Sequence, residues 1–407
     1  MNRWIRMAVL CCFGATAPHL SAVPGVINRV HNPAPNAYII ELEADTPATS
    51  NAETLSHRAG AKLGFVYDTV MNGFSIRGTE QQAIALTRMP GVASVTEVRK
   101  LQPAAVQYSP SKGLDRIDQR TLPLSGSYTY TIYTAPTNVY IVDTGVNPHP
   151  DFGNRLVTNV NFARNSSGVV DPNDYTDNGL PLNDVFHGTA SAVVAAGTQY
   201  GVARWAKIHN VRVCDFGACW DDSIIAGVNF VQQKRNAAPS EVHVANASFV
   251  GAGGPSNSDN AIFNSVNQGM AWILSAGNVH EDACGFYPAS MAATRSGAMS
   301  VGAANPSTDA VEPFSNQGPC VEIFAPGRTL WGHPLGATRE ATGTSISAPF
   351  VTGVFAVRWA NSPTSSAAEI EGVIKGVGTG GVLTNIWANS PNLLLYSVLP
   401  RRPAVGH

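Results

Sequence analysis

Short runs of consecutive apolar residues, separated by helix-like stretches, limit the possible folds of this chain from about residue 113 onward. Residues 139–142 and 271–274 are such runs, and residues 242–247 form a weaker one. A continuous run is typical of a parallel strand that is buried on both faces. Helical stretches at 223–234 and 260–268 lie between the runs. The pattern predicts an α/β domain with a doubly wound, mostly parallel sheet and helices on both faces, where functional residues gather at the carboxyl ends of the strands.

Residues 36–103 have a different pattern, which predicts a separate small α+β domain. Strands alternate with helices over few residues, which suits a small open sheet with helices on one face. The expected strands are 37–42, 71–76 and 92–98, and the expected helices are 56–63 and 80–89. Residues 104–112 are polar and interrupted by proline, so we expect an exposed connector there.

The N-terminus resembles an export signal. Arg3 and Arg6 form a positive region, and residues 7–17 form an apolar segment that is too short to span a bilayer. Small residues follow, and cleavage could come after Ala17 or Ala22. Because Pro18 would directly follow the first site, we expect a signal peptide at 1–22. The alternative is a buried N-terminal strand or helix. An exported chain would be secreted and extracellular.

Composition excludes several classes of protein. The chain has 407 residues, which allows two or three domains. Hydrophobic residues make up 44% and charged residues 13%, the opposite of a disordered chain. The net charge is −2 without a long basic run, so neither nucleic acid nor a membrane is an expected partner.

Four cysteines remain once the signal, with its own two, is removed. They are Cys214, Cys219, Cys284 and Cys320. An even number in an exported protein favours disulfides over free thiols. Three pairings are possible, and the low entropic cost of closing short loops favours Cys214–Cys219 and Cys284–Cys320. A zinc site is a poorer alternative, because the spacing lacks a C-x-x-C pair.

Asp143 ends the first apolar run, in V-D-T-G-V. D-T-G also marks aspartic proteases, but those need two carboxylates that share a proton. The sequence has no second D-T-G or D-S-G, which argues against that class.

His187 begins the run H-G-T-A-S-A-V-V-A-A-G, whose small apolar residues predict a buried helix with the histidine at its N-terminal end. A purely structural histidine is the alternative.

Ser345 lies in A-T-G-T-S-I-S-A-P, at the predicted start of a helix. Backbone N–H groups and the positive end of the helix dipole would stabilise an oxyanion there, although most serines at this place are only caps. Pro349 is expected in the first turn, where proline is tolerated. Asn278 ends S-A-G-N and could donate its amide to an oxyanion, although asparagine after glycine is more often a turn residue.

The order Asp, His, Ser differs from that of α/β-hydrolases and of the chymotrypsin class, and it is the order of subtilisin. Residues 105–399 resemble a subtilisin-like serine protease on the proteinase K side of that family. The motifs that carry the resemblance are I-V-D-T-G-V, H-G-T, S-A-G-N and G-T-S-I-S-A-P, with supporting segments such as F-S-N-Q-G and I-F-A-P-G. Residues 36–100 resemble the inhibitory propeptide of that family, through N-G-F-S and P-G-V-A-S-V.

The resemblance implies a role for each of these residues. Ser345 would attack the peptide carbonyl, His187 would move the proton, Asp143 would orient the imidazole, and Asn278 would bind the oxyanion. A ferredoxin-like propeptide at 23–104 would inhibit the peptidase domain at 105–407 until it is cut off near Ala104 and degraded. The enzyme would be a monomer with protein or peptide substrates and its own propeptide as partners, and it would need no catalytic cofactor.

Two segments match those that enclose a substrate strand, and further residues match the pocket for the side chain before the cut. The segments are Ala218, Cys219, Trp220 and Ser248, Phe249, Gly251, and the pocket residues are Ser275, Ala276, Gly277, Tyr287 and Ala289. Backbone pairing with a strand tolerates many sequences. None of these residues is charged, so we expect broad specificity with an apolar or aromatic preference.

Some positions depart from the family pattern. They are Ala190, Val193, Ile346 and Phe350, which alter packing near His187 and Ser345. Glu322 matches a position often held by Asp in a family calcium site, so structural calcium is a possible expectation. Asn165, in N-S-S, matches a glycosylation site on a loop, whereas Asn246 fits the pattern but lies in an expected buried strand.

Two functions of different classes are open at this stage. The first is an exported serine endopeptidase made as a zymogen. The alternative is a catalytically weak or silent pseudoprotease that binds peptides on the same scaffold. A lipase or esterase is disfavoured because the sequence lacks the G-x-S-x-G elbow around its serine.

Overall fold

The structure is a computed structural model that describes residues 25–30, 33–99, 104–165, 167–178, 186–215, 218–334 and 336–398. The predicted signal peptide lies outside these residues. The chain divides between Leu101 and Gln102 into two compact units, each described separately below. None of the helices in the described ranges is long and apolar enough to cross a membrane.

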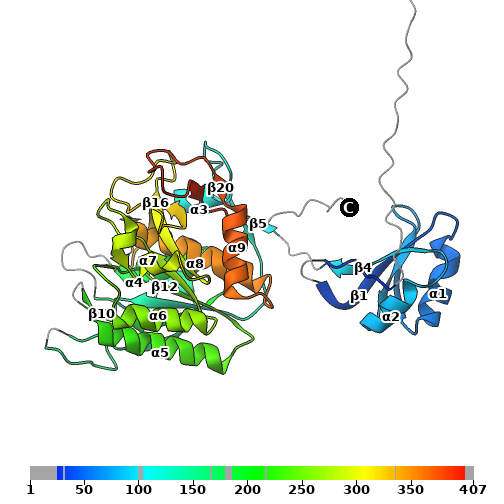
Figure 1. The fold of residues 1–407 in the computed structure, drawn as a ribbon, viewed down its shortest axis with the longest axis horizontal. Helices are drawn as coiled ribbons and strands as arrows, with labels where there is room; N and C mark the ends of the chain where they lie inside the picture. The colour runs from blue at the N-terminus through cyan, green and yellow to red at the C-terminus, as the bar shows by residue number, and fades with distance from the viewer. Residues whose placement is uncertain are drawn as a thin grey trace, which may run out of the picture. The chain divides into compact units, whose positions relative to one another are not determined.

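The first unit is a four-stranded antiparallel sheet with two helices (Figure 1). Its strand order is β2-β3-β1-β4. The elements are β1 (Pro33–Leu42), α1 (Ala48–Arg58), β2 (Lys62–Tyr67), β3 (Gly73–Arg77), α2 (Glu80–Leu86) and β4 (Val92–Arg99). Ile40, Phe74 and Val95 from the strands pack with Leu55 and Leu86 from the helices in one apolar core.

The predicted helix at 56–63 is wrong. Helix α1 begins eight residues earlier, directly after Pro47, and ends at Arg58. Gly60 has a φ of +68°, a conformation that glycine adopts without strain and that stops the helix. Residues from Lys62 then form β2, a strand that the sequence analysis missed.

The second unit is a doubly wound α/β domain, as predicted. In its described residues, nine strands form one sheet in the order β20-β21-β17-β16-β14-β12-β7-β9-β8, parallel except for β20 against β21. The strands are β7 (Thr137–Asp143), β8 (Leu156–Asn161), β9 (Lys207–Arg212), β12 (Val242–Ala247), β14 (Ala271–Ser275), β16 (Ala298–Ala304), β17 (Ile323–Pro326), β20 (Thr379–Gly380) and β21 (Leu393–Leu394).

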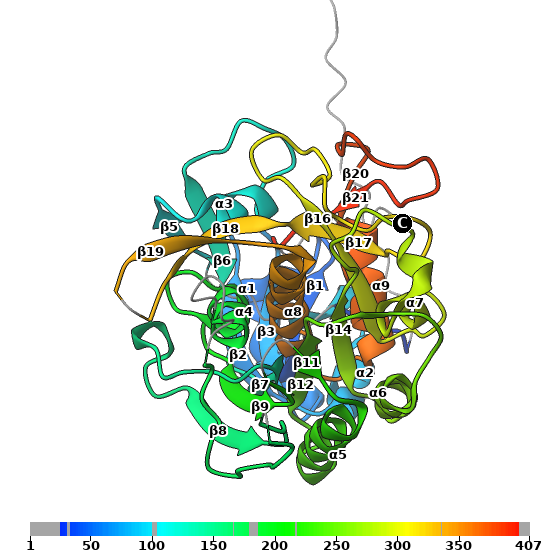
Figure 2. The same ribbon diagram turned by 90° about the vertical axis from the view of Figure 1, so that its left-hand side faces the viewer.

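Helices cover both faces of this sheet, which explains the continuous apolar runs. The helices are α4 (His187–Ala196), α5 (Asp221–Ala237), α6 (Asn257–Asn267), α7 (Ala289–Ala292), α8 (Thr344–Ala360) and α9 (Ala367–Val377). Along β7, Val139 and Ile141 pack with α4 and α8, whereas Tyr140 and Val142 pack with α5 and α6. Figure 1 shows α5 and α6 side by side on one face, and Figure 2 shows α8 near the middle of the unit.

The expected connector at 104–112 is wrong in its first half. Strand β5 (Ala104–Tyr108) pairs antiparallel with β6 (Ser127–Thr131), from Ala104 opposite Thr131 to Tyr108 opposite Ser127. Ser111 then caps α3 (Lys112–Ile117). The alternating residues 104–108 therefore have a partner strand that lies some twenty residues further along the chain.

Candidate active site

Three neighbouring parallel strands end at the same level, and a predicted site residue follows or ends each of them. Strand β12 pairs with both β7 and β14, so that Ala247 lies opposite Val142 and Leu274. The next residues are Asp143 on β7, Ser248 after β12 and Ser275 on β14. The register alone therefore brings these residues to one edge of the sheet, where ligand sites of such folds lie.

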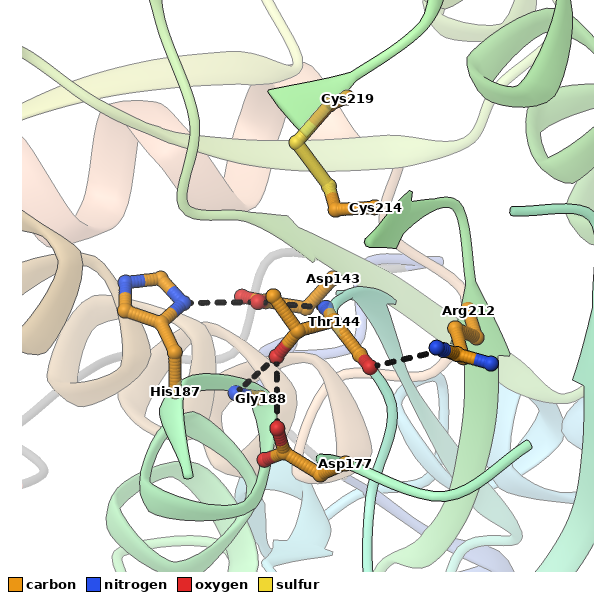
Figure 3. Close-up of a disulfide and its surroundings, with 8 residues drawn as sticks. All are labelled: Asp143, Thr144, Asp177, His187, Gly188, Arg212, Cys214 and Cys219. Carbon is orange, nitrogen blue, oxygen red and sulfur yellow. Dashed lines mark hydrogen bonds and ion pairs between the residues drawn. A yellow bond between two sulfur atoms is a disulfide. The ribbon is translucent and has the colours of Figure 1, made fainter. Parts of the chain in front are cut away.

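Asp143 and His187 form a hydrogen-bonded pair at this edge (Figure 3). Nδ1 of His187 lies 2.7 Å from Oδ1 of Asp143, which also accepts the Thr144 N–H at 2.7 Å. A carboxylate can only accept, so the shared proton belongs to Nδ1 and leaves Nε2 free to act as a base. The His187 side chain is 21% exposed, while that of Asp143 is buried.

The pKa of His187 is raised above its ordinary value. Burial alone would lower this pKa, but the charge and hydrogen bond of Asp143, with the charge of Asp177, outweigh it. The site therefore favours the imidazolium, the form that a histidine reaches when it accepts a proton from a nucleophile.

Ser345 is the second residue of α8, and α8 packs against α4. The expected place of Pro349 in the first turn is wrong, because it is the sixth residue of the helix. Proline there cannot donate to the carbonyl of Ser345 four residues earlier. The Ser248 hydroxyl donates to that carbonyl instead, at 3.0 Å. This bond ties the end of β12 to the first turn of α8.

Asn278 is fixed by the residue before the candidate nucleophile. Its Oδ1 accepts the Thr344 N–H at 2.8 Å and the Thr344 hydroxyl at 2.9 Å. A Cβ on Gly343 would lie 2.9 Å from Oγ of Ser345 and 3.4 Å from Nδ2 of Asn278, so the hydroxyl and the amide flank the same point. Gly343 keeps that space open.

Asn316 is a site residue that the sequence analysis missed. Its Oδ1 accepts the N–H groups of Val279 and Glu281 at 3.1 Å each, and its Nδ2 donates to the carbonyl of Ala276 at 3.0 Å. Gly277 has a φ of +109°, and a Cβ there would lie 2.3 Å from Nδ2 of Asn316. Asn316 therefore fixes the turn that presents Asn278. The motif F-S-N-Q-G was the available signal.

The predicted substrate segments lie beside short two-stranded ladders. Strands β10 (Cys214–Asp215) and β11 (Ala218–Cys219) pair antiparallel, as do β13 (Gly251–Ala252) and β15 (Phe286–Tyr287). Trp220 and Gly251 are exposed and Phe249 is half-buried. Of the expected pocket residues, Tyr287 is half-buried, whereas Ser275, Ala276, Gly277 and Ala289 are buried.

Both expected disulfides are present. Cys214 is bonded to Cys219, and Cys284 to Cys320. The first closes the β10–β11 hairpin and so holds one of the expected substrate segments at the end of β9 (Figure 3).

The two asparagines that fit a glycosylation pattern differ in exposure. Asn165 is exposed and its Oδ1 accepts the N–H groups of Ser167 and Val169, whereas Asn246 is buried in β12.

The departures from the family pattern fill the core between α4 and α8. Ala190, Val193, Ile346 and Phe350 are all buried there. A Cβ on Gly113 of α3 would lie 2.3 Å from the ring of Phe350. The phenylalanine ring therefore fits at this position only because residue 113 has no side chain.

The surroundings of Glu322 do not fit calcium. Nζ of Lys375 lies 2.9 Å from Oε1 of Glu322 and 3.3 Å from Oε1 of Glu371. An ammonium therefore already neutralises the carboxylate that would bind the ion. No group of three metal-ligating side chains occurs anywhere in the described ranges.

Comparison with known proteins identifies the class and then the family. Residues 136–377 match the model of the subtilase family, and residues 37–103 match that of peptidase inhibitor I9. The chain is 35% identical over 343 residues to the extracellular serine proteinase of Thermus sp. strain Rt41A, covering 83% of this chain and 78% of the relative. It is 29% identical to proteinase R of Parengyodontium album, covering 97% and 99%.

Solved structures agree with these matches. A cold-adapted subtilisin-like serine proteinase aligns with a TM-score of 0.62 and 31% identity, over 72% of this chain and all of that one. The protein is thus a serine protease with an N-terminal I9 propeptide. More particularly, the chain belongs to the subtilase family, and its relatives include a proteinase K-like enzyme.

Proposed function

We propose that this protein is a secreted serine endopeptidase made as a zymogen, in which Asp143, His187 and Ser345 form the catalytic triad. The observation that carries the proposal is the 2.7 Å hydrogen bond between Asp143 and His187 at the start of α4, a helix that packs against α8, whose second residue is Ser345. The raised pKa of His187 suits a base that must hold a proton during the reaction.

The residues divide the reaction between them. Oγ of Ser345 attacks the peptide carbonyl while Nε2 of His187 takes its proton, and Asp143 stabilises the resulting imidazolium. Nδ2 of Asn278 and the N–H of Ser345 donate to the oxyanion. His187 then protonates the leaving amine, and water attacks the acyl-enzyme by the same route in reverse.

The zymogen and the secretion rest on separate support. The I9 match supports an inhibitory propeptide at 23–104 that is cut off near Ala104. The name of the extracellular serine proteinase of Thermus supports export of this chain, and the charge and apolar pattern of its N-terminus supports residues 1–22 as the signal. We further propose a preference for an apolar or aromatic side chain before the cut, because Ser275, Ala276, Gly277, Tyr287 and Ala289 carry no charge.

The experiment compares the full precursor with its Ser345→Ala variant. The wild-type chain should process itself, and N-terminal sequencing should find the new end near Ala105. The processed enzyme should digest denatured casein, mainly after apolar residues, and PMSF should inhibit it. Turnover of the variant should fall about 10⁶-fold. A full-length, inactive wild-type chain would instead support the peptide-binding pseudoprotease, and cleavage mainly after Lys or Arg would refute the pocket assignment.

A further inference from the structure

A second carboxylate, Asp177, lies buried behind the Asp143–His187 pair (Figure 3). Asp177 is 2% exposed, and it belongs to the loop between β8 and α4, ahead of His187 in the chain. Its Oδ1 accepts the Thr144 hydroxyl at 3.0 Å. Its Oδ2 accepts both the N–H and the hydroxyl of Thr189, at 2.9 Å and 2.8 Å.

These bonds supply a cap that α4 lacks in its own sequence. The residue before the helix is Phe186, whose side chain cannot accept a hydrogen bond. Asp177 accepts from the third residue of the helix, the position that a local cap would serve. The second residue, Gly188, donates its N–H to the Thr144 hydroxyl at 3.0 Å. The first turn of α4 is therefore held by Asp177 directly and through Thr144.

The same turn is pressed against the D-T-G segment. A Cβ on Gly188 would lie 2.1 Å from the carbonyl oxygen of Gly145 and 3.1 Å from Cβ of Asp143. Gly145 has a φ of +119°, and a Cβ there would lie 2.7 Å from the carbonyl oxygen of Thr176. The first turn of α4, the D-T-G segment and the loop that carries Asp177 are therefore packed in close contact. A shift of Asp177 would move His187 relative to Asp143.

Several charged groups face this cluster. Burial raises the pKa of Asp177 and the charge of Asp143 adds to this effect, while the hydrogen bonds from Thr189 and Thr144 oppose it. Arg212 on β9 donates to the carbonyl of Thr144 at 3.1 Å, but it also pairs with Asp174 and Asp215, each at 2.9 Å. The negative charge of Asp177 adds to that of Asp143 in favouring the protonated imidazole.

We propose that Asp177 is a positioning residue for the peptidase reaction, which holds the first turn of α4 through Thr189 and Thr144 and so keeps the His187 imidazole on Asp143. This inference rests on the proposed triad. Asp177 acts through the residues that carry His187 and through the effect of its charge on the imidazole, and it is not itself a reacting group.

The first test is Asp177→Asn, which keeps the shape of the side chain and removes its charge. We expect kcat on a peptide substrate to fall about 10–100-fold with little change in KM, because misplacement of a reacting group mainly affects the chemical step. The acid limb of the kcat/KM profile should move down by about 0.5 pH unit, because an anion near His187 is lost. Asp171→Asn is the matched control: this carboxylate is on the same loop, exposed, and its Oδ1 accepts from Asn173.

A second pair of variants separates positioning from folding. Thr144→Val removes the hydroxyl and should lower kcat, whereas Thr144→Ser keeps the hydroxyl and should recover most of it. Wild-type kcat and an unmoved acid limb in Asp177→Asn would overturn the proposal, as would equal behaviour of the two Thr144 variants.

A third measurement does not depend on activity. In full-length Ser345→Ala protein, NMR titration of the His187 imidazole should give a lower pKa when Asp177→Asn is added. An unchanged pKa would count against Asp177. If the wild-type enzyme failed to cleave casein, the proposed function would fall, while this titration would still decide the link between Asp177 and His187.

Discussion

The two helices that carry candidate catalytic residues, α4 and α8, are capped differently from α2, α6 and α9, which carry none. Helices α2, α6 and α9 begin with their own capping boxes, formed by Thr79, Ser256 and Ser366 with a residue three positions later. Helices α4 and α8 follow Phe186 and Gly343, which offer no side-chain acceptor. Their first turns are served instead by Asp177, in the loop that precedes α4, and by Asn278, from a segment distant in sequence.

This difference shows what each kind of cap achieves. A local cap stabilises its helix wherever the helix lies. A cap from another segment also fixes that segment against the helix, so it sets the distance between two functional groups. For α2, α6 and α9 the first effect suffices, whereas α4 and α8 at the candidate active site use both.

Among the variants that test this difference between caps, those of Asn278 should cause the largest loss of activity. Asn278→Ala removes both the cap of α8 and an oxyanion donor, and we expect kcat to fall about 10²–10³-fold, the loss known for one such donor in a subtilisin. Asn278→Asp keeps an oxygen for the Thr344 N–H but cannot donate to an oxyanion. Its melting temperature should stay near that of the wild type while its kcat falls as far. Equal loss of stability in both variants would show that the cap does not depend on the oxygen.

The sequence could predict the parts of this site that lie in one segment. Asp143 and His187 were recognisable because each adjoins a buried run of small or apolar residues. Such runs also predicted the α/β fold. The partners of the caps could not be found in this way. Asp177 lies in a loop without a motif, and its place beside Thr144 depends on how the β8–α4 loop packs against the D-T-G segment. Helix α1 was misplaced because its end depends on the backbone of Gly60, not on periodicity.

A buried histidine far from the candidate active site, His209, should make the stability of the fold depend on pH. His209 on β9 is buried against Tyr140, and burial lowers its pKa to about 3, whereas that of His187 is raised. The folded state therefore binds fewer protons at His209 than the unfolded state between pH 6.5 and about 3. Its contribution to stability should be complete above pH 6.5 and should fall by about 1.4 kcal/mol per pH unit below it.

Urea unfolding between pH 7 and pH 4 measures this slope, in the Ser345→Ala background so that autolysis does not interfere. His209→Gln removes the titrating ring, and its stability should depend less steeply on pH. An identical slope in the two proteins would exclude His209 as the source.

Helix α9 is held to the segment before β17 by an ion pair between Lys375 and Glu322, and a variant of Lys375 tests how much this pair contributes to stability. Lys375→Met should leave the buried carboxylate of Glu322 without its cation and lower the free energy of unfolding by about 2 kcal/mol. Because an ammonium neutralises Glu322, EDTA should not lower the melting temperature of the wild type through this site. A calcium-dependent melting temperature that Glu322→Gln abolishes would contradict this interpretation.

The smallest effect is expected for a local cap. Ser366→Ala should lower the free energy of unfolding by about 1 kcal/mol, because it removes the hydroxyl that accepts the Glu369 N–H. Since α9 bears none of the candidate catalytic residues, kcat and the pH profile should not change. A fall in kcat comparable to that of Asp177→Asn would remove the distinction between the two kinds of cap.

The pairing of β5 with β6 has a consequence for anyone who shortens this protein. A recombinant version that starts after Tyr108 would lack β5 and leave the backbone N–H and C=O groups of β6 without their ladder. An open strand edge of this kind invites pairing between molecules, so such a truncation should aggregate.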